Sequence, residues 1–330
     1  MCGRYATARS RQELLDQFQA EVDAVDEELE PDYNVAPTKQ VPAILTRAPK
    51  DAPEEEPAVR QLRTLRWGLV PSWAKDLAIG NKMINARVET VHEKPSYRRA
   101  FAKRRCLLPA DGYFEWYVLQ QQEEEQAKKK RPQKQPFFIH PKDGEVMAMA
   151  GLYELWKSPE GEWVWSTTII TTDAPDDLGR IHDRMPMIVQ PDRWDAWLDP
   201  CLTDTDEVRG LLVPALSGAL AGTMTAYPVS KAVNNVRNNG PELIEPATDG
   251  DSSGKHSATL FWPLPTPSRR RPDARPPLPG AYREESGAPW TPSPPVPVSW
   301  TCSPSWTDRS RSSRASTPSA SRRPPTPDPA

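Results

Sequence analysis

Apolar and polar residues alternate in short runs between Cys2 and Pro246, a pattern typical of β-strands. Turn signals such as Asp143-Gly144 and Pro159-Glu160-Gly161 separate several of the runs. The alternation predicts strands over residues 2–7, 41–46, 60–69, 106–116, 136–140, 146–153, 163–171 and 185–189. We expect residues 34–38 to form a turn between two of these elements.

Fewer segments have helical spacing. Ser10 is placed to cap an amphipathic helix over residues 11–25, with Leu14, Leu15 and Phe18 on one face. Residues 85–90 should begin a helix-rich connector, 97–101 a helical turn, and 192–198 a short helix. Short strands with interspersed helices predict a single α+β domain, built on an antiparallel sheet with peripheral helices.

Residues 2–246 form the expected domain, and residues 247–330 form a tail of a different kind. The tail is rich in Ser, Pro, Arg and Thr, so it buries too little apolar surface to fold, and we expect it to be disordered. Its Trp and Tyr residues follow no period. Such a composition resembles the translation of GC-rich DNA in the wrong frame, which suggests that a frameshift produced the tail. Residues 47–57 and 120–134 are expected to be charged loops or exposed helix.

Composition excludes several classes of protein. No run approaches the ~18 apolar residues of a membrane span, and the N-terminus lacks the apolar core of a signal peptide. The four cysteines have no close partner in sequence, which fits a reducing cytoplasm better than a disulfide framework and excludes a CxxC-type zinc site. We therefore expect a cytoplasmic protein without a metal or cofactor.

The net charge is −3, but the charges are unevenly distributed. Acidic residues cluster in segments 23–30, 51–56 and 123–125, whereas arginines concentrate elsewhere, at Arg4, Arg87, Arg98, Arg99, Arg104, Arg105, Arg180 and Arg184. A local basic face on an acidic body is compatible with DNA binding, and it lowers the expected non-specific affinity.

Cys2 carries unusual potential chemistry. Removal of Met1 would leave one residue with a free α-amine and a thiol, which titrate near ~8 and ~8.5 when unperturbed. The amine can condense with an aldehyde to a Schiff base, and the thiol can then close a thiazolidine ring. The alternative is an incidental residue at a frayed terminus.

Three further motifs contain candidate site residues, and each also has an ordinary interpretation. Asn85 in segment 85–90 could cap a helix, and Glu115 among the aromatics of 111–116 could be a surface residue. His182 in segment 181–186 could be a solvated loop histidine held by Asp183. The arginines in or near these motifs could be unpartnered surface charges.

Together the motifs are more specific than any one of them. They occur in the order MCGR at 1–4, YNVAPT at 33–38, RWGLVPSW at 66–73, NARVET at 85–90, CLLPADGYFEW at 106–116 and HDRMP at 182–186. This set resembles the SRAP family, the SOS-response-associated peptidase domain proteins that shield abasic sites in DNA. Residues 228–246 resemble the C-terminal signature of that family. The resemblance covers residues 2–246, and the chain departs from it at 120–134 and after Pro246.

The resemblance implies a catalytic set. Cys2 would attack the ring-opened aldehyde of the abasic sugar and form a thiazolidine crosslink. Glu115 would act as general acid and base, with its pKa raised by its aromatic surroundings. His182 would assist ring opening and proton transfer, and Asn85 would orient the adduct by hydrogen bonding.

The resemblance also implies a DNA surface for a monomer that binds abasic sites in single-stranded DNA in a bacterial, nucleoid-associated setting. Arg4, Arg87 and Arg184 would hold the flanking phosphates. Trp67 and Trp73 are candidates for base stacking, although we expect one of the two to belong to the core. The implied DNA contacts also include Asn34 and Pro37.

Two other functions stay open at this point. An N-terminal cysteine can be the nucleophile of an autoprocessing peptidase or amidohydrolase, with Glu115 and His182 assisting the removal of Met1. A passive single-strand-binding module, in which Cys2 has no role, would bind intact and abasic strands equally.

Overall fold

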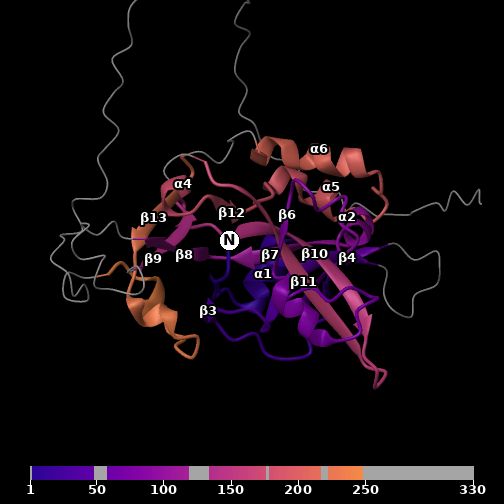
Figure 1. Ribbon diagram of the computed structural model, residues 1–330, viewed down its shortest axis with the longest axis horizontal. Coiled ribbons are helices and arrows are strands. Elements are labelled where there is room, and N and C mark those ends of the chain that lie inside the picture. Colours follow the sequence, from indigo (N-terminus) through magenta and orange to yellow (C-terminus); the bar gives the residue numbers. More distant parts are fainter. Residues whose placement is uncertain (1, 48–57, 119–133, 176–177, 217–221, 248–330) are drawn as a thin grey trace, which may run out of the picture.

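The computed structural model describes residues 2–47, 58–118, 134–175, 178–216 and 222–247. The tail and most of the two charged insertions considered above lie outside these residues. The described chain forms one α+β domain of mostly antiparallel sheet with a few helices, as the sequence predicts (Figure 1).

Two sheets make up the domain. The smaller sheet has the order β13-β9-β8-β1-β3, with β1 at Tyr5–Thr7, β3 at Asp32–Val35, β8 at Gly112–Val118, β9 at Lys134–Pro141 and β13 at Met224–Pro228. The larger has the order β12-β11-β10-β7-β4-β5-β2, with β2 at Val22–Asp23, β4 at Gln40–Arg47, β5 at Val59–Trp67, β7 at Arg105–Ala110, β10 at Met147–Lys157, β11 at Trp163–Asp173 and β12 at Arg184–Pro186. A short strand, β6 at Asn85–Arg87, pairs with β11 in parallel.

The larger sheet curls back on itself. Strand β5 pairs with β4 along its length and also with β11, where Arg66 lies opposite Ser166 in a parallel register. The pairings therefore join β5, β4, β7, β10 and β11 into a closed ring. Successive side chains of a strand point to opposite faces, so this ring has an inside and an outside, each with its own set of apolar residues.

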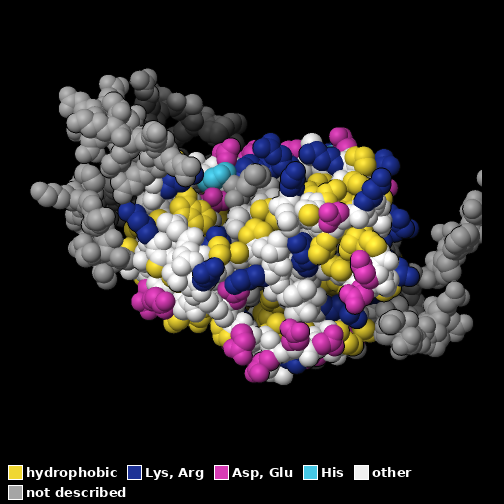
Figure 2. All heavy atoms as spheres, turned by 60° about the horizontal axis from the view of Figure 1, so that its bottom comes forward, with side chains coloured by type: hydrophobic (Ala, Val, Ile, Leu, Met, Phe, Trp, Pro, Cys, Tyr) yellow, Lys and Arg dark blue, Asp and Glu magenta, His cyan; other side chains and the backbone are white. Residues whose placement is uncertain are grey.

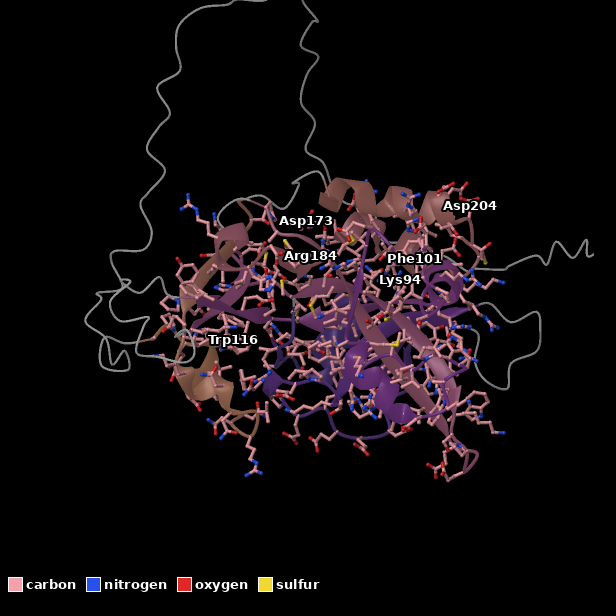
Figure 3. The ribbon with its side chains drawn as sticks, viewed as in Figure 1. Lys94, Phe101, Trp116, Asp173, Arg184 and Asp204 are labelled. Carbon is pink, nitrogen blue, oxygen red and sulfur yellow. The ribbon has the colours of Figure 1, made fainter. Side chains whose placement is uncertain are left out.

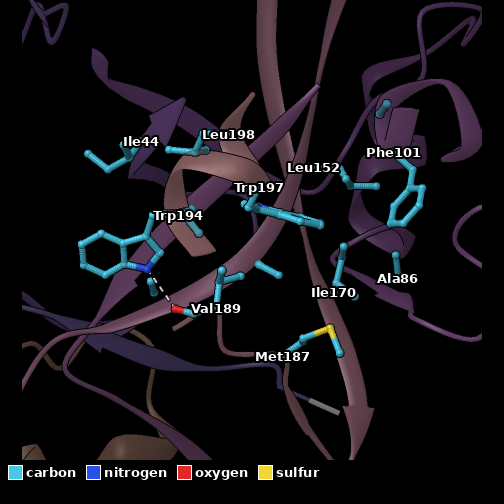
Figure 4. Packing of buried hydrophobic residues seen from close by; sticks show 14 of the residues in the cluster. Ile44, Ala86, Phe101, Leu152, Ile170, Met187, Val189, Trp194, Trp197 and Leu198 are labelled. Atoms are coloured by element: carbon cyan, nitrogen blue, oxygen red, sulfur yellow. Dashed lines mark hydrogen bonds between the residues drawn. The ribbon is translucent and has the colours of Figure 1, made fainter. Parts of the chain in front are cut away.

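Helices cover the outside of the ring, with three exceptions. The helices are α1 at Arg11–Gln17, α2 at Arg98–Lys103, α4 at Leu178–Ile181, α5 at Trp194–Leu198 and α6 at Thr205–Leu216, with 3-10 turns η1 at Leu77–Lys82, η2 at Pro191–Arg193, η3 at Lys231–Asn234 and η4 at Pro241–Ile244. The exceptions are α4, which packs on β8 and the inward-facing residues, and η3 and η4, which pack on the smaller sheet. Phe101, Trp194 and Trp197 of the outer helices pack against outward-facing strand residues such as Ile44 and Ile170 (Figure 4). The inward-facing set instead reaches the smaller sheet and includes Cys2 and Tyr5.

Three elements differ from the sequence-based expectation. The helix predicted over 11–25 has its predicted cap, since Ser10 and Glu13 form a capping box, but it ends at Gln17. Gln19 adopts a φ of 51°, which breaks the helix, and residues 22–23 pair with β5 instead. Residues 85–87 form a strand rather than the start of a helical connector.

The third difference is at residues 106–116, which form two strands rather than one. Asp111 separates β7 of the larger sheet from β8 of the smaller sheet. Its carboxylate accepts hydrogen bonds from the Ala8 amide at 2.6 Å and from Nε of Arg9 at 2.9 Å. This corner carries the chain from one sheet to the other. Helices α4 and α6 and strands β3 and β13 have no counterpart among the expected elements, and Asn34 and Val35, expected in a turn, belong to β3.

No helix within the described ranges is long and apolar enough to cross a membrane.

Candidate functional site

Cys2 lies buried among the inward-facing residues of the ring, and its backbone is held by Asn85. The Asn85 side chain donates a hydrogen bond from Nδ2 to the Cys2 carbonyl at 2.7 Å. Residues 83 positions apart in the sequence thus meet at one place. The end of the chain lies near the middle of the molecule in Figure 1.

Strand β6 brings Asn85 to this place, and the RWGLVPSW motif supports β6. Trp67 donates from Nε1 to the Ile84 carbonyl at 2.9 Å, next to Asn85. Gly68, at a φ of 124°, packs so closely on Gly80 that a Cβ on it would lie 2.6 Å from the Gly80 carbonyl oxygen. Tyr97 donates its hydroxyl to the Asn85 carbonyl at 3.3 Å. The backbone at Asn85 is therefore held by Trp67 at the preceding residue and by Tyr97 at its own carbonyl.

Glu115 of β8 is a buried carboxylate, only 4% exposed. Burial raises its pKa to about 7, against the opposing positive charge of the chain's N-terminus. A carboxyl group with such a pKa can give and take protons near neutrality, which is what a general acid and base requires. The buried position of Glu115 thus agrees with the predicted rise in its pKa.

His182 faces Glu115 from the segment that follows α4, with Nε2 4.0 Å from Oε2 of Glu115. Its other ring nitrogen, Nδ1, is 3.0 Å from the amide nitrogen of Arg184 and 2.9 Å from Oδ1 of Asp183. Burial and the positive N-terminus lower the pKa of His182. The structure therefore brings together Cys2 with Asn85, and Glu115 with His182.

The surroundings of the Cys2 thiol favour its neutral form. Burial, followed by the negative charge of Glu115, raises the pKa of this thiol far above its ordinary range. A reaction that needs a preformed thiolate at Cys2 is disfavoured, because little thiolate exists near neutral pH.

Arg184 is nearly buried and bound by protein acids. Nη1 lies 2.6 Å from Oε1 of Glu89 and 2.6 Å from Oδ1 of Asp173, and Nη2 donates to the Thr171 carbonyl at 2.6 Å. Figure 3 shows Arg184 beside Asp173 at the edge of the larger sheet. The guanidinium expected to hold a DNA phosphate is thus engaged by two carboxylates.

Arg4 has no carboxylate partner among the described residues. It donates from Nη1 to Oδ1 of Asn34 at 2.6 Å and to the Val233 carbonyl at 2.9 Å, with its guanidinium 5.8 Å from the Trp116 ring centroid. Arg87 is exposed and makes no ion pair with any described residue. These two arginines keep positive charge available near the site.

Asn34 and Pro37 occupy different settings. Asn34 is fully buried and donates from Nδ2 to the carbonyls of Val233, Asn235 and Asn238 at 3.3, 3.1 and 2.9 Å. It holds the C-terminal signature segment and Arg4, so a direct DNA contact by Asn34 is incompatible with its position. Pro37 is partly exposed, beside Thr38 with its positive φ of 79°.

The two candidate tryptophans separate as expected, one in the core and one on the surface. Trp67 is 0% exposed and packs edge-on against Tyr5, with ring centroids 5.1 Å apart. Trp67 offers no face to a base, which corrects its assignment as a stacking residue. Trp73 is 59% exposed and keeps its indole available.

Sequence reasoning missed Glu89 and Trp116, although both belong to motifs that it singled out. Trp116 follows Glu115 and donates from Nε1 to Oδ1 of Asn234 at 2.7 Å. The sequence signal for Trp116 was its position next to Glu115 in the motif at 106–116. Among the described residues, no group of three His, Cys, Asp or Glu side chains could hold a metal ion.

Charged side chains are unevenly distributed over the described surface. On the face shown in Figure 2, acidic side chains gather along the lower edge, and most lysine and arginine side chains lie above them. Apolar side chains are scattered over this face among both kinds of charged side chain.

Comparison with known proteins agrees with the motifs. The family model described as SOS response associated peptidase (SRAP) matches residues 1–236. The chain is 40% identical over 245 residues to abasic site processing protein YoqW of Bacillus subtilis (strain 168), covering 74% of this chain and 99% of that protein. It is 32% identical over 281 residues to abasic site processing protein HMCES of Rattus norvegicus, covering 74% of each.

A solved structure also has this fold. The crystal structure of a protein from Bacteroides thetaiotaomicron superposes with a TM-score of 0.59 at 25% identity, covering 75% of this chain and all of that one. The motifs, the family model and the relatives agree, and the chain belongs to the SRAP family.

Proposed function

We propose that this protein processes abasic sites in single-stranded DNA by linking itself to them through Cys2. The observation that carries the proposal is the pairing of Cys2 with Asn85 and of Glu115 with His182, with Glu115 close enough to raise the pKa of the Cys2 thiol, in a chain whose relatives are named abasic site processing proteins. Removal of Met1 would expose the α-amine of Cys2 beside these side chains.

The bonding steps follow from the chemistry of an amine and a thiol on adjacent carbons. The α-amine adds to the aldehyde carbon of the ring-opened abasic sugar, and loss of water gives an imine. Sγ then adds to the imine carbon while the thiol proton passes to nitrogen, which closes a thiazolidine. Glu115, with a pKa of about 7, can carry the protons in both steps, and His182 can assist ring opening.

The neutral state of the Cys2 thiol favours this reaction over a thiolate-dependent amidohydrolase. In the thiazolidine route the amine reacts first, and the thiol adds only after an electrophilic imine stands next to it. The imine also provides a route to strand cleavage by β-elimination, with Glu115 taking the proton.

We further propose how the strand is held. Arg4 and Arg87 would contact phosphates, Trp73 would stack on a base, and Pro37 would line the path of the strand. A single strand suits this site because the lesion must leave a base stack to reach a buried residue. The proposed unit is a monomer of residues 2–246, acting in the cytoplasm, and residues 247–330 are not needed.

The test is a denaturing gel after incubation with an oligonucleotide that carries one abasic site. We expect a heat-stable shifted band with the wild-type chain and with a chain that ends at Pro246. Cys2→Ala and an uncleaved N-terminal extension should abolish it. Cys106→Ser is the matched control, since Cys106 is, besides Cys2, the free buried thiol of the described residues, and this change should leave the band unchanged.

Two controls distinguish the alternatives. Cys2→Ser keeps the amine, so borohydride should still trap its Schiff base although no heat-stable band forms. If the wild-type chain binds intact and abasic strands equally and forms no covalent band, the protein is a passive binding module and the proposal is wrong.

A further inference from the structure

Glu89 and Arg184 join the two segments that carry Asn85 and His182. Glu89 follows Asn85 by four positions, and its Oε1 and Oε2 lie 2.6 and 3.2 Å from Nη1 and Nη2 of Arg184. Such a two-point contact fixes the orientation of a guanidinium as well as its distance. Strand β12, which starts at Arg184, is thereby fastened to the end of β6.

The two acids that bind Arg184 are unequal. The Asp173 side chain is 84% exposed and supplies one oxygen, whereas the Glu89 side chain is 46% exposed and supplies two. Water screens the Asp173 contact more strongly. Glu89 is therefore the main acidic partner of this guanidinium, beside the Thr171 carbonyl.

Arg184 in turn contacts His182 through its backbone. Its amide nitrogen lies 3.0 Å from Nδ1 of His182, and the Asp183 carboxylate lies 2.9 Å from the same ring nitrogen. Nδ1 accepts from the amide when it is unprotonated, and it donates to Asp183 when it is protonated, so the two contacts compete. The competition decides which ring nitrogen of neutral His182 carries the proton.

Two observations favour the amide. A backbone N–H is always a donor and has a fixed direction, whereas the Asp183 side chain is 85% exposed and its charge is screened. Burial lowers the pKa of His182, which favours the neutral ring, in which Nδ1 can accept from the amide. The proton then sits on Nε2, the nitrogen 4.0 Å from Oε2 of Glu115.

We infer that Glu89 is a positioning residue: by clamping Arg184 it holds the Arg184 amide against Nδ1 of His182, which sets His182 as the Nε2–H tautomer facing Glu115. The inference rests on the proposed function for its catalytic meaning, because an Nε2–H donor can protonate an oxygen of the sugar or adduct. The tautomer itself can be measured without DNA.

The test is an NMR measurement on the full chain with ¹⁵N-labelled histidine. The chain has four histidines, and His182→Asn identifies the signal of interest. We expect the wild-type spectrum to show an unprotonated Nδ1 and a protonated Nε2 on His182. Glu89→Ala should shift both nitrogens toward a mixture of tautomers and should slow crosslink formation and reversal by about tenfold.

Matched variants separate positioning from folding. Glu89→Gln keeps one acceptor for Arg184 and should restore most of the tautomer signature. Asp173→Asn alters the same guanidinium at its exposed contact and should change neither the tautomer nor the rate. Glu89→Ala leaves Arg184 bound to Asp173 and the Thr171 carbonyl, so we expect its fold to persist.

The outcomes are decisive in either direction. A wild-type His182 protonated on Nδ1, or a Glu89→Ala chain with the wild-type tautomer, would overturn the inference. If no crosslink forms at all but the tautomer depends on Glu89, the proposed function fails while the positioning role of Glu89 stands.

Discussion

The side-chain amide of Asn85 donates to the carbonyl of Cys2 at 2.7 Å, so the residue that is to react is positioned through its backbone. Asn85 therefore occupies neither the amine nor the thiol of Cys2, and the thiol itself donates a weak hydrogen bond to the Arg4 carbonyl at 3.9 Å. It also means that a change at Asn85 should affect the geometry of Cys2 before it affects the chemistry.

We expect Asn85→Ala to slow crosslink formation by about tenfold, the equivalent of one lost hydrogen bond of ~1.4 kcal/mol. The initial rate of band formation on the abasic oligonucleotide measures the effect. Asn81→Ala is the matched control, because Asn81 is an exposed residue of η1 whose side chain accepts a hydrogen bond from the partly buried Arg66 and has no other hydrogen bond to the described residues. Equal rates for the Asn85 variant and the wild type would remove Asn85 from the site.

Glu115 should make the protein less stable as the pH rises. Its carboxyl is uncharged in the folded state up to a pKa of about 7 but ionises near ~4.3 when unfolded, so folding stability falls as the pH rises from ~4.3 through 7. Glu115→Gln removes this dependence and should raise the free energy of unfolding at pH 8 by a few kcal/mol (about 1.4 per pKa unit).

The same substitution should reduce crosslinking and remove an inflection near pH 7 from its rate profile. Urea unfolding at pH 5 and pH 8 and crosslinking rates over that range check the two effects together. A Glu115→Gln chain that is no more stable than the wild type at pH 8 would show that the raised pKa is absent.

Trp73→Ala should weaken binding to intact single-stranded DNA by ~1–3 kcal/mol without lowering the stability of the fold. Fluorescence anisotropy measures the affinity and thermal unfolding the stability. Trp163→Ala is the control, since Trp163 is an exposed indole at the start of β11 and is 61% exposed. Similar losses for both tryptophans would mean that Trp73 has no special place on the DNA path.

Arg105 should be essential to the fold. It is buried, and its five N–H groups donate to the carbonyls of Phe101, Ala102, Trp197, Asp199 and Leu202. Lysine has three donors on one atom and cannot reach these directions. We expect Arg105→Lys to lower the free energy of unfolding by ~2–4 kcal/mol, read from urea unfolding, whereas Arg99→Lys on the exposed face of α2 should change little.

Apolar runs revealed most of the strands because several strands of the ring are apolar on the face toward its inside and on the face toward its outside. They missed β6, since three residues are too short to show a period and their place is set by pairing with β11. The end of α1 at Gln17 likewise depends on the pairing of residues 22–23 with β5, which overrides the local helical spacing. Closure of the ring is a tertiary property that no local pattern encodes.

The candidate site was predictable where the motifs named the reacting groups. Asn85, Glu115 and His182 have chemical side chains in distinctive sequence settings. The engagement of Arg184 by Glu89 and Asp173, and of Asn34 by three backbone carbonyls, was not predictable. The role of each of these side chains depends on which groups the fold places beside it. An arginine or an asparagine in these motifs could equally well contact DNA.

Cys2 and Cys106 share the interior of the ring, and burial raises the pKa of both thiols. A thiol-directed reagent should therefore discriminate little between the two cysteines. Only the position of Cys2 in the chain distinguishes it, because cleavage before it would add an amine. A small aldehyde probe should consequently label this protein at one residue, and it would report whether the initiator methionine has been removed.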